Sequence, residues 1–182
     1  MKIISGKYKG RKLEGFDIVG TRPTMDRVKE SLFATIQDYL ANSIILDLFS
    51  GSGNVGLEAL SQGAKNAYLV DANKKATNTI KKNIENIGIS SAEVLTMDYK
   101  KALDYLKTKN IKFDVIFLDP PYKTDYIEKS IDLISKYDIL NNNGIIVCES
   151  DDLDKIIYRD EYTSIKDKKY GDKYIVLLQK IW

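Results

Sequence analysis

The chain contains no histidine and only one cysteine, Cys148, among its 182 residues. Without histidine, Ser-His-Asp and Cys-His catalysis are excluded, and so are the His/Cys clusters that hold zinc. A single cysteine also excludes an internal disulfide, and the apolar residues beside Cys148 indicate a small buried side chain. Any chemistry must therefore use carboxylates, lysine, tyrosine, backbone groups or a cofactor, and we expect no metal.

Long apolar runs are missing as well. No stretch reaches the roughly 18 apolar residues of a membrane-spanning helix. The first residues, 1–6, lack the apolar segment of a secretory signal. We therefore expect a protein of the cytoplasm that does not bind a membrane. The length suits one globular domain over residues 24–182, with a small basic extension over residues 1–23.

Proline is scarce, yet two of the three prolines stand side by side at Pro120 and Pro121, after the apolar run 113–118. A proline pair cannot continue a strand, because neither residue has a backbone N–H and both have a fixed φ. The preceding residue, Asp119, is restricted to an extended conformation. The sequence therefore predicts a stiff corner with a carboxylate at one end and the Tyr122 ring at the other. This pairing suits a nucleobase that carries an exocyclic amine.

From residue 44 onwards, short apolar runs alternate with helical patterns, which is typical of a parallel sheet with crossover helices. The predicted strands are 44–49, 67–71, 93–97, 113–119 and 145–149, and the predicted helices are 54–63, 73–87, 99–108 and 124–137. Two further runs, 158–166 and 173–181, predict an antiparallel hairpin that completes the sheet. The fold class is therefore α/β: a Rossmann-like, mostly parallel seven-stranded sheet with a C-terminal antiparallel hairpin. Glycines that punctuate residues 1–20 predict a small N-terminal β-hairpin extension.

A glycine-rich segment follows the first predicted strand, with Gly51, Gly53 and Gly56 in the spacing G-x-G-x-x-G. Between a strand and a helix, these glycines let the backbone approach a ligand, and the helix N-terminus offers free N–H groups. Alone, the pattern fits a nicotinamide dinucleotide site, and it also fits a tight packing turn.

Acidic residues follow the ends of successive predicted strands: Asp47, Asp71, Asp98 and Asp119, with Glu149 as a fifth. These strand ends meet at one edge of a parallel sheet, where open α/β sheets bind their ligands. Asp71 has the spacing from Gly51 of a carboxylate that holds ribose hydroxyls, and Asp98 is placed to accept a hydrogen bond from an adenine amino group. The cluster favours a ligand with hydroxyls, an amine and a positive centre over a pyrophosphate.

Basic residues gather at the N-terminus. The first 13 residues carry Lys2, Lys7, Lys9, Arg11 and Lys12 and no acid. Because the whole chain has a net charge of only +2, the remainder is mildly acidic. A basic arm on an acidic body suggests a polyanionic partner such as a nucleic acid.

Together these motifs resemble class I S-adenosylmethionine-dependent methyltransferases that modify exocyclic amines. More narrowly, the whole chain resembles the RsmD family of bacterial 16S rRNA guanine-N2 methyltransferases. The resemblance is carried by the segments 4–13, 21–24, 27–33, 47–53 and 57–64. The chain departs from the family at Asn54, where a small residue is commoner, and at Gln62, where arginine is expected.

The resemblance implies S-adenosyl-L-methionine as methyl donor and one specific guanine of 16S rRNA as target. It also implies that the RNA is presented in a small-subunit assembly particle; we expect a monomeric enzyme. The predicted cofactor-binding residues are Asp47, Phe49, Gly51, Gly53, Asp71, Asp98 and Asp119. In the predicted catalytic corner, Asp119 and the carbonyl of Pro120 accept hydrogen bonds from the amine, and Tyr122 stacks on the flipped base. The predicted RNA contacts are Lys7, Lys9, Arg11, Lys12 and Arg22.

Three other interpretations stay open at this point. A DNA methyltransferase acting on adenine N6 or cytosine N4 uses the same corner, although such enzymes usually carry a larger target-recognition region. A nicotinamide-dependent oxidoreductase accounts for the glycine segment and leaves the corner at residues 119–122 unexplained. A non-catalytic RNA-binding module accounts for the basic arm and does not require the row of carboxylates.

Overall fold

The buried apolar runs of the sequence form the strands of one sheet. The computed structural model describes residues 1–15 and 22–182, and it gives only the backbone of residues 22–25. Within this part of the chain the strands are β1 (Ile44–Asp47), β2 (Asn66–Asp71), β3 (Ala92–Thr96), β4 (Phe113–Leu118), β5 (Leu140–Ser150), β6 (Tyr162–Tyr170) and β7 (Lys173–Lys180). The predicted strands are all present, with ends that differ by a few residues.

The helices occupy the amphipathic segments between the strands. They are α1 (Arg22–Ile36), α2 (Asn54–Ser61), α3 (Lys74–Ile87), α4 (Tyr99–Thr108) and α5 (Tyr126–Tyr137). Helix α3 shows why such a segment is helical. The Asn73 side chain caps its first turn, Ala76 and Ile80 are buried on its inner face, and Gly88 ends it with a φ of 83°.

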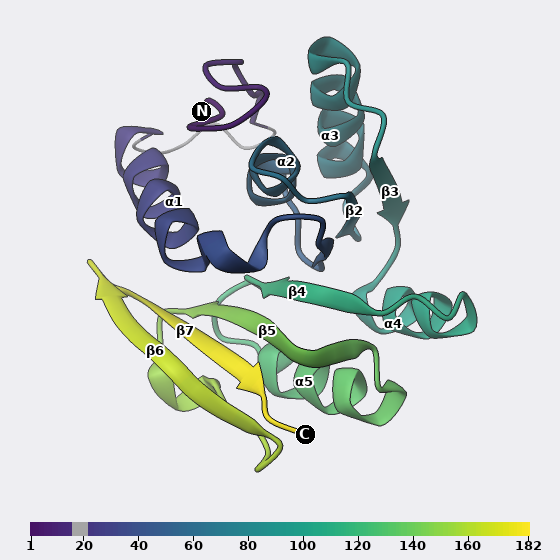
Figure 1. Cartoon of the computed structure of the whole chain (residues 1–182), viewed down its shortest axis with the longest axis vertical. Helices are drawn as coiled ribbons and strands as arrows, with labels where there is room; N and C mark the ends of the chain where they lie inside the picture. Colours follow the sequence, from purple (N-terminus) through teal and green to yellow (C-terminus); the bar gives the residue numbers. More distant parts are fainter. Residues whose placement is uncertain (16–21) are drawn as a thin grey trace.

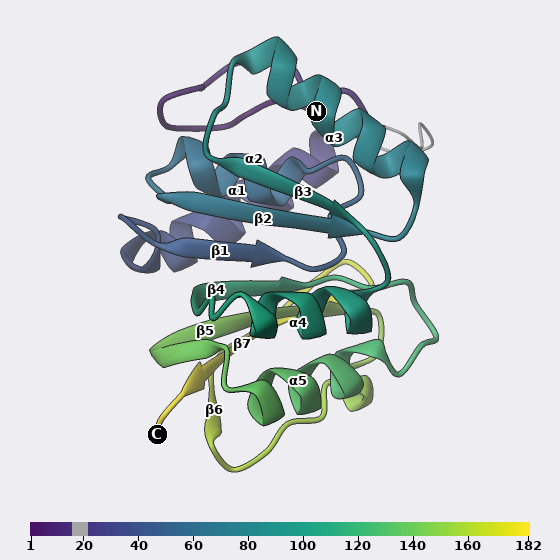
Figure 2. The ribbon, with the colours of Figure 1, turned by 90° about the vertical axis from the view of Figure 1, so that its right-hand side faces the viewer.

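The strand order is β3-β2-β1-β4-β5-β7-β6, with β1 to β5 parallel and the last hairpin antiparallel (Figure 1 and Figure 2). The direction of winding changes between β1 and β4, which are neighbours although β2 and β3 lie between them in sequence. In open α/β sheets this switch point is where ligands bind, beyond the carboxyl ends of the strands.

Helices cover both faces of the sheet. Buried residues of α4 and α5 pack with one set of strand side chains, and those of α1, α2 and α3 pack with the other set. Figure 2 shows α4 and α5 in front of the sheet and α1 behind it. Strands buried on both sides must be apolar throughout, which explains the continuous apolar runs in the sequence. Cys148 lies fully buried in this core, where burial raises the pKa of its thiol.

The N-terminal residues form a loop whose two arms run antiparallel, paired through Lys2 and Lys12. The backbone N–H of Ile3 donates to the carbonyl of Arg11 at 2.9 Å, and Leu13 donates to Met1 at 3.0 Å. The predicted hairpin is therefore short and pairs at a single bridge. Ile3 and Leu13 are buried in the same core cluster as residues of α1, α2 and α3, so this loop packs as part of the molecule. The division of the chain at residue 23 stays a prediction.

Within the described residues, no helix is both long and apolar enough to pass through a lipid bilayer.

Candidate functional site

A cleft of about 1540 Å³ opens at the carboxyl edge of the sheet. Its walls include the residues that follow β1, β2 and β4, the end of β5, the start of β7 and one side of α1. The predicted residues Asp47, Phe49, Gly51, Asp71, Asp98, Asp119, Pro120 and Tyr122 all line this one cleft. The parallel topology thus brings together side chains that are far apart in sequence.

Asp47 closes β1 and is almost completely buried, with 3% of its surface exposed. Its Oδ2 atom has no hydrogen-bond partner among the described residues. Burial raises the pKa of Asp47 to about 7, against the effects of the Ser50 hydroxyl and the Gly56 N–H, and the charge on Asp71 adds to the rise. A buried carboxylate oxygen without a donor, on the wall of a cleft, fits a ligand that brings an ammonium group.

Replacing Asp47 by asparagine is therefore expected to stabilise the ligand-free protein more at pH 8 than at pH 5. The unfolded chain releases the Asp47 proton near its ordinary pKa of 3.8, whereas the folded chain keeps it to about pH 7, so wild-type stability falls between these values. At about 1.4 kcal/mol per pH unit, the whole loss is about 4 kcal/mol, of which about 2 to 3 kcal/mol falls between pH 5 and pH 8. Denaturant unfolding at both pH values measures it, and a variant less stable than wild type at pH 8 would contradict it.

The glycine segment is fixed by hydrogen bonds to the neighbouring strand. The Gly51 N–H donates to Asp71 Oδ2 at 2.9 Å, and the other oxygen of Asp71 accepts from the Asn73 N–H at 2.9 Å. Gly53 has a φ of 83°, which favours glycine. At Gly56 an added Cβ would lie 2.0 Å from a methyl carbon of Leu69, so only glycine lets α2 pack this closely on β2.

Asp98 is exposed and caps α4, since its Oδ1 accepts from the Lys100 N–H at 2.9 Å.

Next to Asp98 lies an aromatic cluster that the sequence did not predict. The Phe49 ring lies 5.3 Å from Tyr99 and 6.2 Å from Tyr126 between centroids, and all three residues line the cleft. Flat apolar rings beside a free carboxylate oxygen suit an adenine base.

The proline corner stands opposite the end of β1, because Asp47 pairs with Phe117 of β4, two residues before Asp119. Pro120 is buried, while the Tyr122 ring is 43% exposed. The corner ends in a turn in which the Thr124 hydroxyl donates to the Pro121 carbonyl at 2.8 Å. A carboxylate and an accessible ring thus face the same cleft as Asp47.

Two further charged residues lie at this corner. The Lys173 Nζ atom is 3.0 Å from Glu149 Oε1 and 5.7 Å from the centre of the Tyr122 ring. Glu149 belongs to the predicted row of acids, whereas nothing in the sequence pattern marked Lys173. Its place follows from the antiparallel pairing of β5 and β7, in which Glu149 lies opposite Ile175.

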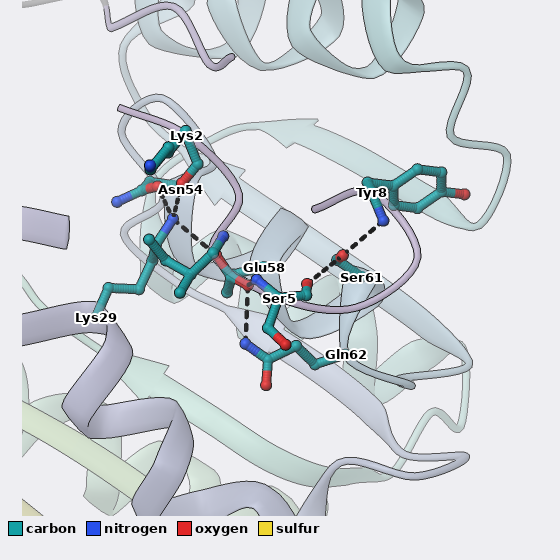
Figure 3. Close-up of polar contacts among 9 residues, drawn as sticks. Lys2, Ser5, Tyr8, Lys29, Asn54, Glu58, Ser61 and Gln62 are labelled. Atoms are coloured by element: carbon teal, nitrogen blue, oxygen red, sulfur yellow. Dashed lines mark hydrogen bonds and ion pairs between the residues drawn. The ribbon is translucent and has the colours of Figure 1, made fainter. Parts of the chain in front are cut away.

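A buried ion pair fixes the N-terminal loop to α2 (Figure 3). Lys29 Nζ lies 2.9 Å from Glu58 Oε1, and both side chains are at most 2% exposed. Glu58 also accepts hydrogen bonds from the backbone N–H groups of Ile4 at 2.8 Å and Ser5 at 3.2 Å. One carboxylate therefore joins α1, α2 and the N-terminal loop.

Both departures from the family pattern belong to this cluster (Figure 3). Asn54 Oδ1 accepts from Lys29 Nζ at 2.7 Å, and the Gln62 amide donates to Glu58 Oε2 at 2.8 Å. Asn54 and Gln62 thus complete the hydrogen bonding of a buried charge pair, which explains polar residues at these two positions.

The predicted RNA contacts lie mainly on the N-terminal loop. Lys7, Lys9, Arg11 and Lys12 are all exposed there. Arg11 also donates to the Asn86 carbonyl near the end of α3, so it helps to hold the loop in place. The loop meets the cleft at its ends, because Met1 and Gly15 both line it. Arg22 begins α1, and its side chain lies outside the described residues.

Residues 1–179 match the family model described as Conserved hypothetical protein 95. The chain is 37% identical over 173 residues to Ribosomal RNA small subunit methyltransferase D of Haemophilus influenzae, covering 94% of this chain and 89% of that protein. The protein of the same name from Escherichia coli (strain K12) is 34% identical over 151 residues, or 83% and 75% of the two chains.

A solved structure of an Escherichia coli protein superposes with a TM-score of 0.87 at 30% identity, covering 100% of this chain and 98% of the other. The similarity therefore includes the N-terminal loop as well as the sheet. On the match of sequence and fold over nearly its whole length, the chain belongs to the ribosomal RNA small subunit methyltransferase D family.

Proposed function

We propose that this protein transfers a methyl group from S-adenosylmethionine to the exocyclic N2 of a guanine in 16S rRNA. The observation that carries the proposal is the corner at residues 119–122, which faces the same cleft as the buried Asp47 and the glycine segment. One side of the cleft suits a nucleoside with an amino group, and the other suits a flat base with an exocyclic amine.

The cofactor side is supported by three kinds of group. The unpartnered Oδ2 of Asp47 fits the amino group of the methionine portion. Asp71 would accept hydrogen bonds from the ribose hydroxyls, and Asp98 and the Phe49 ring would hold the adenine, since all three residues line the cleft. When bound, S-adenosylmethionine supplies a methyl group on a positively charged sulfur, for which nearby carboxylates are favourable neighbours.

The substrate side is supported by the chemistry of the guanine amine. Its lone pair is delocalised into the ring, so the amine is a poor nucleophile. Hydrogen bonds from N2–H to Asp119 and to the Pro120 carbonyl favour the pyramidal geometry in which the lone pair points at the methyl group. Stacking of the base on Tyr122 contributes about 1 to 3 kcal/mol, by analogy with single-strand binders.

The proposal of an RNA substrate rests on the family to which the chain belongs and on the positive charge of the N-terminal loop. Relatives are named ribosomal RNA small subunit methyltransferase D, and the exposed basic loop borders the cleft. We propose guanine 966 of 16S rRNA as the target. The substrate is a small-subunit assembly particle, and the enzyme acts in the cytoplasm as a monomer without a metal.

Incubation with labelled S-adenosylmethionine tests this function directly. Small-subunit particles from cells that lack the protein, protein-free 16S rRNA and duplex DNA serve as alternative acceptors. We expect label in the particles, recovered as N2-methylguanosine at one position. Label in N6-methyladenine or N4-methylcytosine of DNA would replace the proposal with a DNA methyltransferase.

Neutralising Lys7, Lys9 and Lys12 to glutamine together is expected to weaken RNA binding and to flatten its dependence on salt. Each lost phosphate contact reduces the slope of log K against log salt by roughly 0.7 to 0.9. Arg11 is kept because it also anchors the loop through Asn86. Binding titrations at several salt concentrations measure the slope. Replacing Lys65, Lys81 and Lys101 in the same way provides a control of equal charge, and equal slopes for the two triple variants would exclude the loop as the RNA contact.

A further inference from the structure

Three charged side chains meet at the proline corner, and the proposed function uses only Asp119. Glu149 lies at the end of β5, and Lys173 begins β7 just after the turn of the C-terminal hairpin. Their ion pair measures 3.0 Å, and the Glu149 side chain is only 19% exposed. Both residues line the cleft together with Asp119 and Tyr122.

Lys173 links the carboxylates to the stacking ring. Its Nζ atom lies 5.7 Å from the centre of the Tyr122 ring while it is paired with Glu149. A lysine held over an aromatic face is attracted by the electrons of the ring. Because the same ammonium group is paired with Glu149, Lys173 is held next to Tyr122, on which the target base would stack.

Asp119 lies beside this ion pair in the sheet. Leu118 of β4 pairs with Cys148 of β5, so Asp119 and Glu149 are the next residues in register on neighbouring strands.

Asp119 as a residue is exposed to the cleft. Protein nevertheless surrounds its carboxyl group, and this burial is the main cause of its raised pKa. The neighbouring charge of Glu149, and more weakly that of Asp47, raises the pKa of Asp119 further, whereas Lys173 lowers it. The Tyr122 hydroxyl is a further titratable group at the corner, and burial also raises its pKa. Asp151, Tyr170 and Asp172 line the cleft nearby.

Lys173 keeps its positive charge in this setting. Burial by itself would lower the pKa of the Lys173 ammonium, but the attraction of Glu149 and Asp119 outweighs burial and holds that pKa above its ordinary value. The corner therefore contains a permanent cation next to two carboxylates that repel each other.

We propose that Glu149 and Lys173 are positioning residues for methyl transfer, with Lys173 holding Asp119 in its ionised form and Glu149 holding Lys173 over Tyr122. This inference rests on the proposed function.

As N2 of guanine forms its bond to the methyl carbon, the carbon–sulfur bond breaks and its electron pair stays on sulfur. The amine then carries one surplus proton, which passes to the Asp119 carboxylate and from there to water in the cleft. Asp119 must therefore be ionised at the start of each transfer.

The test is the pH dependence of single-turnover methylation at saturating cofactor and RNA. The two substitutions act on Asp119 in opposite directions. Lys173→Met removes the cation and is expected to move the acidic limb of the rate profile up by about 1 pH unit or more. Glu149→Gln removes the repelling charge but keeps a hydrogen-bond acceptor for Lys173, and it is expected to move the limb down.

Lys173→Arg is expected to restore the wild-type limb, because it restores the charge. Lys169→Met is the matched control, since this lysine lies on the same hairpin but does not line the cleft. A limb that stays in place in both test variants, or moves the same way in both, would overturn the inference. Denaturant unfolding curves identify a variant that fails to fold. If Lys173→Met fails to fold, Glu149→Gln decides, because an acidic limb that does not move down in that variant overturns the inference. If the wild-type protein itself forms no N2-methylguanosine, the proposed function is wrong. This outcome differs from one in which the wild-type protein is active and the limbs of the variants do not move, which overturns only the inference about Glu149 and Lys173.

Discussion

Replacing Asp119 by alanine is expected to slow methyl transfer by about 10²- to 10³-fold, the effect of removing one preorganised hydrogen-bonding group from an active site. The expected change in S-adenosylmethionine affinity is at most a few-fold, because Asp119 acts on the amine of the base. Single-turnover methylation measures the rate, and calorimetry measures cofactor binding.

Asp125→Ala is the matched control for this variant. Asp125 lies six residues further along, is paired with Lys129 at 3.0 Å and does not line the cleft. We expect the control to keep the wild-type rate. Near-normal turnover in Asp119→Ala would remove this residue from the mechanism, and an equal loss of cofactor binding would place it on the donor side.

Replacing Lys29 by methionine is expected to lower the free energy of unfolding by about 3 to 5 kcal/mol. The substitution leaves the Glu58 carboxylate fully buried without its cation, and the remaining donors, including the Ile4 N–H and the Gln62 amide, do not neutralise it. Denaturant unfolding at neutral pH measures the change.

Lys129→Met is the control, because the Lys129–Asp125 pair has a similar length but is about half exposed. Exposed pairs contribute roughly 0 to 1 kcal/mol. The double variant Lys29→Met, Glu58→Leu is expected to recover much of the stability, since it removes both charges. Equal losses from Lys29→Met and Lys129→Met would show that burial of the first pair has no energetic effect.

The wall of the cleft beyond β1 and β2 could be predicted from the sequence because its parts are local or fixed by topology. The segment from Asp47 to Gly56 is continuous, and its spacing indicates a strand, a tight turn and a helix. Asp71 and Asp119 follow strands, and parallel strands place their carboxyl ends at one edge. The proline pair marked the corner because no strand continues through it.

Other features depend on packing that no sequence period encodes. Lys29 and Glu58 come from two helices, and their contact requires that α1 lie across α2. Lys173 reaches Glu149 only through the register of β5 with β7. Strand β5 begins at Leu140, five residues before the predicted start, because Leu140 pairs with Phe113 through backbone groups that the polar residues 141–143 do not reveal.

A crystal structure with S-adenosylhomocysteine bound tests the central claim most directly. We expect the amino group of the ligand to donate to Asp47 Oδ2, and its sulfur to face the space between Asp119 and Tyr122. A ligand bound with protein between its sulfur and this corner would contradict the claim, because no amine held by Asp119 could then reach the methyl group.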